Sequence, residues 1–425
     1  MAWQKRGIVI GIIGTTIYGM AMINPGPVHG QVGIPSTPAT KAVAGPETNI
    51  IPSVTLSERY DSNVFFAPGG NNEDYVSTVS PQLKVVHKRQ LVEGTVGGGV
   101  TAEAYVKNPR LNYVGFNGVI ELNLDGAMSE LVRGLGLKIS DTYIQTPQLP
   151  SFAAPAGGGQ PAQPFAQGVQ AQRANSSTNV AKVAASYEVS PALSFTSTYT
   201  DQRIRFGSSI STPTGGKETS VIDTTFQTVE SGPVLKVSSI DTLTLHHLYQ
   251  KGAFGSQGSK SDFSAHGAIA GWTSLLTRTL TASITGGVTI FSTINDLQYL
   301  GSASLLWKGQ DTDLTLSYRR AIMPSISVSG VPLLNQGVTA TATHRMTEHF
   351  SVSLNGNYAI NQSIPDSSFL KFESYSVTPS VDYKVSRIMT ASLFYTHSMF
   401  TQITSLQESS FDRNLVMLRI FAEWK

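Results

Sequence analysis

Hydrophobic and polar residues alternate one by one along most of the chain beyond residue 30. Between Leu280 and Ile290 aliphatic side chains hold most even positions and Thr or Ser most odd ones, and the stretch from Phe350 to Ile360 repeats this pattern. A period of two predicts β-strands with one apolar and one polar face. The alternation runs for about 10 residues, which exceeds a mean soluble strand and suffices to cross a bilayer at a tilt.

Short and long connections alternate between these strands. Eight short connections are expected at residues 87–89, 125–129, 189–192, 237–241, 274–278, 308–312, 346–349 and 385–387. They join sixteen strands, and one further strand at each end brings the total to about 18, with 16–18 as the range. An even number with both termini on the short-turn side predicts an all-β, transmembrane, antiparallel up-and-down β-barrel. Its first and last strands must pair, because lipid offers unpaired backbone groups no partner.

The beginning of the chain differs from the rest. Lys5 and Arg6 precede an apolar stretch from Gly7 to Ile23, and short residues precede a cleavage point after Gly30. Residues 1–30 are therefore expected to be a secretory signal peptide. The alternative is a retained membrane anchor, for which about 17 residues are short. Residues 31–51, rich in Pro, Thr, Ala and Gly, are expected to be a disordered periplasmic tail, and residues 52–425 the barrel.

Composition supports a membrane barrel with a wet interior. Charged residues make up 14% of the chain, against roughly 25% in ordinary soluble proteins, and hydrophobic residues make up 40%. Neutral polar residues and 39 Gly replace the missing charge. A soluble extracellular β-protein is the alternative. The net charge of +2 comes from dispersed residues, which gives no sign of a nucleic-acid partner.

Residues for catalysis or metal binding form no recognisable motif. The chain has no Cys and eight His, and the adjacent pair His246 and His247 would point to opposite faces of a strand. No nucleophile elbow, phosphate loop or paired-His metal spacing is present in the sequence. We therefore expect no enzymatic activity, no cofactor and no metal. An outer-membrane hydrolase remains an alternative, and it would need Ser or Asp beside His on adjoining strands.

The alternation also predicts which charged side chains line the interior. These are Arg59, Asp61, Lys84, Glu93, Glu103, Lys107, Glu121, Lys182, Glu188, Asp313 and Arg319. Charges of both signs among many hydroxyl groups suit a wall that passes neutral hydrated solutes such as saccharides, without a strong ion preference. Alternatively, the charges only solvate the interior and pair across it.

One short segment resembles a known family. The run from Leu56 to Phe65, followed by Asp74 and then Val79, Ser80 and Pro81, is similar to the opening hairpin of the beta-barrel porin 2 family. The resemblance covers about 30 residues and implies an outer-membrane pore or an export-linked barrel, associated with capsular or exopolysaccharide systems. The residues that carry it are Glu58, Tyr60, Asp61, Asn63 and Pro81. They could contact a cation or sugar at the outer rim, or serve only as turn residues that bond their own backbone.

Two further segments carry expectations about partners. The last strand, residues 414–425, is expected to be recognised by the barrel-insertion machinery, although Lys425 follows Trp424 where such barrels usually end on an aromatic residue. The loop from Pro147 to Thr178 could fold inward as a constriction or stay outside.

The sequence thus predicts a Gram-negative outer-membrane pore embedded in lipid, with polysaccharide as a possible partner. The alternative is a structural or adhesive barrel with a blocked lumen.

Overall fold

The fold is taken from a computed structural model of the whole chain. It describes residues 47–65, 72–146, 173–210, 223–256, 259–292, 296–323, 332–364, 370–404 and 408–424. The expected signal peptide and most of the loop from Pro147 to Thr178 lie outside these residues. The described helices are η1 (Pro109–Leu111) and α2 (Asp125–Leu131), and neither has the length or hydropathy to span a bilayer.

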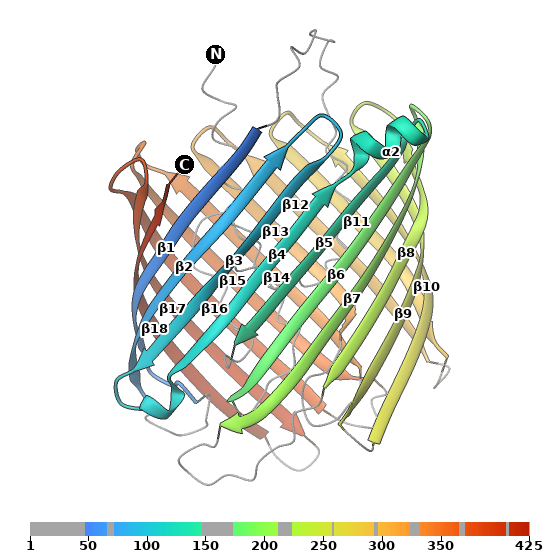
Figure 1. Cartoon of the computed structure of the whole chain (residues 1–425). Helices are drawn as coiled ribbons and strands as arrows, with labels where there is room; N and C mark the ends of the chain where they lie inside the picture. Colours follow the sequence, from blue (N-terminus) through green and yellow to red (C-terminus); the bar gives the residue numbers. More distant parts are fainter. Residues whose placement is uncertain are drawn as a thin grey trace.

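The strands form one closed antiparallel sheet of 18 (Figure 1). Each strand pairs with its neighbours in sequence, and β1 pairs with both β2 and β18, which confirms the predicted barrel and strand number. The strands are β1 (Glu47–Asp61), β2 (Asp74–Lys88), β3 (Glu93–Tyr105), β4 (Tyr113–Asn123), β5 (Leu135–Thr146), β6 (Arg173–Ser190), β7 (Leu193–Ile210), β8 (Thr224–Lys236), β9 (Asp241–Ser256), β10 (Ser259–Leu275), β11 (Leu280–Phe291), β12 (Leu297–Lys308), β13 (Thr312–Met323), β14 (Leu333–Arg345), β15 (Phe350–Ser363), β16 (Leu370–Lys384), β17 (Met389–Thr404) and β18 (Glu408–Glu423).

All eight predicted short connections lie at one end of the barrel. The start of β1 and the end of β18 also lie there (Figure 1), and we call this the turn end and the opposite one the loop end. One connection, between β4 and β5, contains the helix α2 where a simple turn was expected. Gly126 lets α2 settle on the β2–β3 turn, because a Cβ there would come within 2.6 Å of the Gln90 carbonyl oxygen. Gly134, at φ +84°, then turns the chain into β5.

The first strand begins earlier than expected. Residues 47–51 were assigned to the tail, yet Glu47 to Ile51 pair in register with Lys88 to Lys84 of β2. β18 reaches only as far as Ser53, opposite Glu423, so the start of β1 is held by one neighbour. The Pro-rich composition hid this strand, because Pro52 interrupts the local pattern even though its carbonyl accepts the Trp424 amide at 3.0 Å.

The outer face of the barrel is apolar and carries aromatic residues at two levels. Large aliphatic side chains such as Leu56, Val96 and Leu354 are exposed there. The exposed outward-facing aromatic residues at the turn end are Tyr187, Phe195, Trp307, Tyr383 and Trp424. Those at a level further towards the loop end are Tyr75, Phe116, Tyr143, Tyr199, Tyr299, Tyr318, Tyr358, Tyr375 and Tyr395. An apolar belt between two aromatic girdles is the surface of a barrel that sits in lipid.

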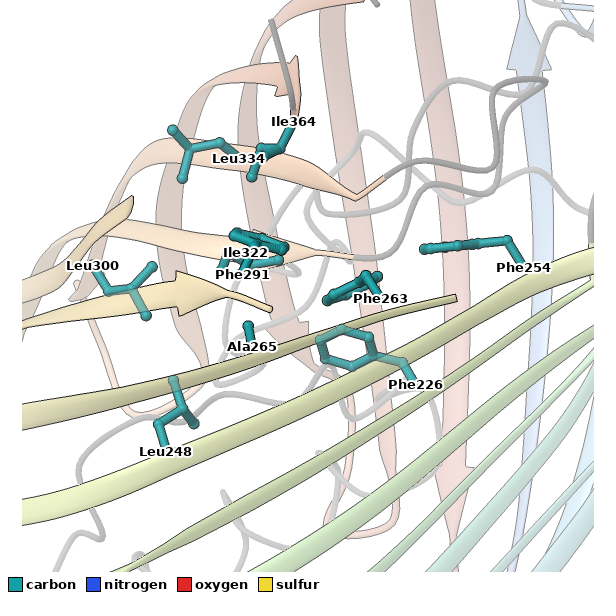
Figure 2. Close-up of a cluster of buried hydrophobic side chains, with 10 residues drawn as sticks. All are labelled: Phe226, Leu248, Phe254, Phe263, Ala265, Phe291, Leu300, Ile322, Leu334 and Ile364. Carbon is teal, nitrogen blue, oxygen red and sulfur yellow. The ribbon is translucent and has the colours of Figure 1, made fainter. Parts of the chain in front are cut away.

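The interior holds a buried apolar cluster towards the loop end (Figure 2). Phe263 lies at its centre, with ring centroids 6.0, 5.8 and 5.5 Å from those of Phe226, Phe254 and Phe291. These rings occupy interior positions of β8 to β11 that the period-two pattern would otherwise give to polar residues. The cluster therefore closes part of the interior wall to water.

Strands β13 and β14 join this cluster by leaning inward at the loop end. Ile322 and Leu334 belong to the cluster, although the alternation puts them on the same face as the exposed Tyr318 and Val338. Pairing between β12 and β13 stops at Gly301 and Arg320. Beyond that point the Arg320 Nε donates to the Tyr299 carbonyl oxygen at 2.9 Å. This bond satisfies a backbone acceptor where β12 and β13 no longer pair.

Candidate functional site: the barrel interior

The pairing register decides which side chains face inward. Asp61 pairs with Asp74, Arg59 with Val76, and Val76 in turn with Tyr105. Side chains at paired positions lie on the same face of a sheet, so interior positions can be followed around the barrel. This parity puts Arg59, Asp61, Lys84, Glu93, Glu103, Glu121, Lys182, Glu188, Asp313 and Arg319 on the inner face.

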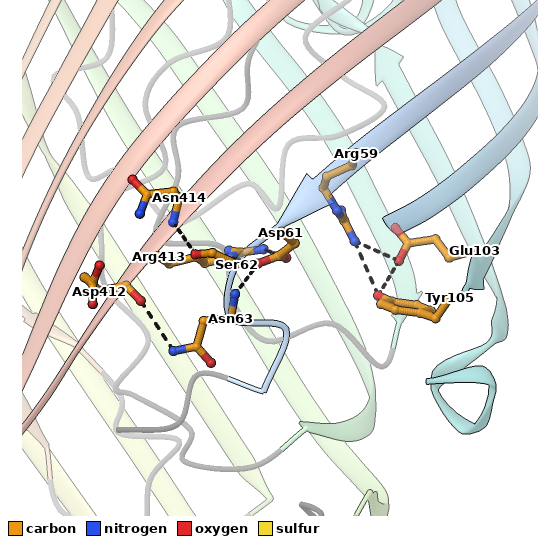
Figure 3. A network of polar contacts seen from close by, with 9 residues as sticks. All are labelled: Arg59, Asp61, Ser62, Asn63, Glu103, Tyr105, Asp412, Arg413 and Asn414. Atoms are coloured by element: carbon orange, nitrogen blue, oxygen red, sulfur yellow. Dashed lines mark hydrogen bonds and ion pairs between the residues drawn. The ribbon is translucent and has the colours of Figure 1, made fainter. Parts of the chain in front are cut away.

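A group of polar residues holds the first strand to the last at the loop end (Figure 3). Both carboxylate oxygens of Asp61 accept from the guanidinium of Arg413, at 2.8 Å from Nε, and both side chains are buried. The Asn63 amide also donates to Asp61, at 3.1 Å. The contact between Asp61 and Arg413 is bidentate and charge-assisted. The bond from the Asn63 backbone amide means that the Asp61 side chain also stabilises the turn that follows it.

Backbone and amide contacts complete this group. The Ser62 amide donates to the Asn414 carbonyl at 2.9 Å, and the Asn414 amide donates back to the Ser62 hydroxyl at 2.8 Å. Asn63 Nδ2 donates to the Asp412 carbonyl at 3.4 Å. We call these six residues, Asp61, Ser62, Asn63, Asp412, Arg413 and Asn414, the closure clasp. It joins β1 and β18 where their ladder ends at Asp61 and Leu415.

A second charged contact lies beside the clasp. The Arg59 guanidinium donates to Glu103 and to the Tyr105 hydroxyl, each at 3.3 Å, and Tyr105 donates to Glu103 at 2.7 Å (Figure 3). The contact bridges β1 and β3 over the small Val76 of β2. Arg59 of β1 and Glu103 of β3 therefore pair at close range.

The residues of the family resemblance divide between two places. Asp61 and Asn63 belong to the closure clasp, where both turn chemistry and an ion pair use them. Glu58 and Tyr60 have the outward parity: Glu58 accepts from the Ser77 hydroxyl and Tyr60 donates to Glu73, both at 2.8 Å. Pro81 lies opposite Val54 on the same outer face.

The remaining predicted interior residues are dispersed. Lys84 is buried on β2, and Asp313 lies opposite Lys308 near the turn end. Glu93 lies opposite Lys88, also near the turn end. Arg319 faces the interior of β13, with its Nη2 3.8 Å from the Met323 sulfur. Lys107 lies beyond β3 at the loop-end rim, where it pairs with Glu73 and covers the Tyr75 ring.

Neutral polar side chains cover the interior of β14 to β17. The polar interior positions include Asn335, Thr339, Thr341, Thr343, Ser351, Ser353, Asn355, Asn357, Asn361, Ser363, Ser374, Ser376, Thr378, Ser380, Ser392, Thr396 and Ser398. Apolar residues of the same face, among them Phe372, Phe394 and Phe400, are buried between them. Many of the polar side chains bond across neighbouring strands, as Asn335 does to Asn361 at 2.8 Å and Thr341 to Asn355 at 2.9 Å. We call this surface the neutral wall. Its charged interior residues among the described ones, Arg345 of β14 and Asp382 and Lys384 of β16, lie at the turn end.

One interior histidine has some of the partners that the catalytic group of a hydrolase would need. His246 of β9 contacts the Glu230 carboxylate through Nδ1 at 2.6 Å and the Thr196 hydroxyl through Nε2 at 3.3 Å. The hydroxyl belongs to a threonine, and His246 is buried, which leaves little room for a substrate. We interpret this trio as a polar contact that ties β7, β8 and β9 together. No group of three metal-ligating side chains gathers among the described residues.

The class of protein follows from the outer and inner surfaces together. A closed antiparallel barrel with an apolar belt, two aromatic girdles and a polar interior is a transmembrane β-barrel of the bacterial outer membrane.

No family model matches the sequence, and the search of curated proteins finds no match. The resemblance to the beta-barrel porin 2 family therefore stays a prediction. Among solved structures, the chain is similar to the outer membrane protein opdK from Pseudomonas aeruginosa, with a TM-score of 0.46 and 10% identity, covering 88% of this chain and 99% of that one.

Two other solved structures give similar values. OccAB3 from Acinetobacter baumannii has a TM-score of 0.44 and 11% identity over 89% of this chain and 100% of that one. The siderophore receptor PirA from Pseudomonas aeruginosa has a TM-score of 0.44 and 8% identity over 90% of this chain and 81% of that one. The fold assignment therefore rests on the strand pairing of this chain itself.

Proposed function

We propose that this barrel is a pore for neutral hydrated solutes, with saccharides as the class that its interior suits best. The neutral wall carries this proposal. Hydroxyl and amide groups both donate and accept hydrogen bonds, so they can exchange partners with the hydroxyl groups of a sugar as it passes. A wall without fixed charge in its middle also holds no counter-ion that a neutral solute would have to displace.

The charges elsewhere in the interior fit the same function. Arg59, Asp61, Glu103 and Arg413 are engaged with one another at 3.3 Å or less, so their fields largely cancel. A ring of one sign, which would select ions, is not formed by these residues. The short family resemblance around Tyr60 is the support for exopolysaccharide as the transported saccharide. We propose exopolysaccharide transport as a special case of saccharide transport.

Flux and conductance measurements on the refolded full chain would test this. In planar bilayers we expect discrete conductance steps with weak cation or anion preference. In liposomes we expect a neutral trisaccharide to enter faster than a sulfated sugar of the same size, which serves as the matched control. A chain that inserts without conductance steps, or that passes the sulfated sugar faster, would contradict the proposal.

A structural or adhesive barrel with a blocked lumen is the second candidate. Burial favours it, because Ser376 and Thr378 face the interior and yet have no exposed surface. A freely wetted bore would leave such side chains accessible. Deleting residues 150–175 separates the two candidates: an adhesive barrel would lose polymer binding with unchanged permeability, whereas a pore would change its flux.

A further inference from the structure

The outer face of β7 to β9 turns from apolar to charged towards the loop end. Tyr199 of β7 faces outward and is exposed, and the next residues of the same parity are Asp201, Arg203 and Arg205. On β9 the outward Tyr249 is followed by the exposed Lys251. We call Arg203, Arg205 and Lys251 the cationic collar.

The collar begins at the height of the headgroup layer and extends beyond it. A strand rises about 3.3 Å per residue and tilts by roughly 40°, so Arg203 stands roughly 10 Å beyond Tyr199 and Lys251 roughly 5 Å beyond Tyr249. Headgroups extend about 5–8 Å on each side of the hydrocarbon. Tyrosines of a girdle mark the boundary of that hydrocarbon, so Lys251 lies within the headgroup layer and Arg203 lies just beyond its outer edge.

The two carboxylates that bind the collar arginines lie deeper than those arginines. The Asp201 side chain is 7% exposed and accepts from Arg203 Nε at 2.7 Å and from Gln227 Nε2 at 3.1 Å. The Arg203 and Arg205 side chains are each 56% exposed. Asp223 accepts from Arg205 at 3.1 Å and from the Phe206 amide at 2.9 Å. A third carboxylate, Asp262 of β10, lies opposite Ala253 on the same outer face and is exposed beside Lys251, so the charges balance in number. Around Arg203 and Arg205, whose partners lie deeper, the exposed surface presents donors and positive charge.

We propose that the cationic collar binds the phosphorylated headgroup of lipopolysaccharide in the outer leaflet. Long loops of such barrels face outward and short turns face the periplasm, so the collar at the loop end lies in the leaflet that contains lipopolysaccharide. Guanidinium groups match phosphate oxygens in a two-pronged geometry, and a lysine adds a point charge. Both Asp201 and Asp223 hold an arginine by one edge, which orients the groups before a lipid arrives.

Binding of purified lipopolysaccharide to the full chain in neutral detergent would test this. The variant R203Q/R205Q/K251Q removes the charges and keeps polar side chains, and R133Q/R278Q/R387Q removes three exposed arginines at the turn end as a matched control. We expect the collar variant to bind at least tenfold more weakly, and the control variant to bind as the unmodified chain does.

A second measurement keeps the test decisive if the collar variant fails to fold. The unmodified chain should bind intact lipopolysaccharide at least tenfold more tightly than a dephosphorylated preparation. Equal affinity for the two preparations, or a folded collar variant with unchanged affinity, would overturn the proposal. Equal binding to phosphatidylglycerol would also overturn it, because the collar would then recognise negative charge in general. None of these outcomes depends on whether the barrel conducts solutes.

Discussion

The closure clasp and the neutral wall lie in the same interior but use polar groups in opposite ways. In the clasp, Asp61 and Arg413 are buried and saturated by one another, which fixes where the last strand meets the first. In the neutral wall, hydroxyl and amide groups make single, uncharged bonds such as that of Thr341 to Asn355. Charged groups that are buried and bonded to each other do not bind a solute without breaking the ion pair. A neutral hydrogen bond, by contrast, can exchange its partner at little cost. Under the proposed function, closure belongs to the clasp and contact with solute to the neutral wall.

Breaking the clasp should have the largest effect. Arg413→Met leaves the Asp61 carboxylate buried without its cation, which costs about 3–5 kcal/mol for such pairs. We expect a lower unfolding midpoint in urea with lipid vesicles and a larger fraction of unfolded chain in a heat-shift gel assay.

A double variant provides the control for this prediction. Asp61→Asn with Arg413→Met removes both charges and should recover much of the loss, as a double-mutant cycle would measure. If the single and double variants were equally destabilised, the ion pair would not be what holds β1 to β18.

Neutralising the neighbouring contact should have a smaller effect. Glu103→Gln keeps an acceptor for the Tyr105 hydroxyl but removes the charge that faces Arg59, at a cost of about 1–3 kcal/mol. The freed positive charge should also shift the pore towards anions. The same change at Glu130, exposed on α2 at the turn end, is the control and should alter neither quantity. An unchanged midpoint for Glu103→Gln would show that Arg59 does not depend on this partner.

A charge placed in the neutral wall should change transport more than stability. Thr341 is half-buried, so Thr341→Asp should fold, and its carboxylate should favour cations about fivefold, as roughly 1 kcal/mol of local potential would. Reversal potentials in a salt gradient measure this ratio, and Thr341→Asn is the uncharged control. The comparison between the two regions fails if Thr341→Asp leaves both ion preference and sugar flux unchanged while Glu103→Gln alters them.

The barrel itself was predictable because its signal is local. Alternation along Leu280 to Ile290 and the spacing of eight short turns fixed the strand number, and closure followed from the absence of hydrogen-bonding partners in lipid. The start of β1 at Glu47 was missed, since its strand character comes from pairing with β2 rather than from its own composition. The helix α2 was missed for a similar reason. In the sequence Gly126 indicates a turn, and its close contact with the β2–β3 turn, which makes room for a helix, is visible only in the structure.

The interior was predictable only in outline. Parity identified Asp61 as inward-facing, but its partner Arg413 is 352 residues away and no local pattern links the two. The apolar cluster had a visible signal, since Phe226, Phe254 and Phe291 occupy positions of the polar phase. Pattern analysis treats such residues as exceptions, whereas packing turns them into a buried group.

An exposed ion pair should have the smallest effect and completes the series. Glu73 and Lys107 pair at the loop-end rim with side chains 43% and 44% exposed, and the hydrogen bond from Lys107 lowers the pKa of Glu73 below its usual value. Because the folded pKa is the lower one, any stabilisation is present above the unfolded pKa and is lost as pH falls through the folded one. Solvent screens such a pair, so Glu73→Gln should leave the unfolding midpoint at neutral pH unchanged and only flatten its decline in acid. A loss at neutral pH as large as that of Glu103→Gln would mean that burial is not what separates structural ion pairs from incidental ones in this barrel.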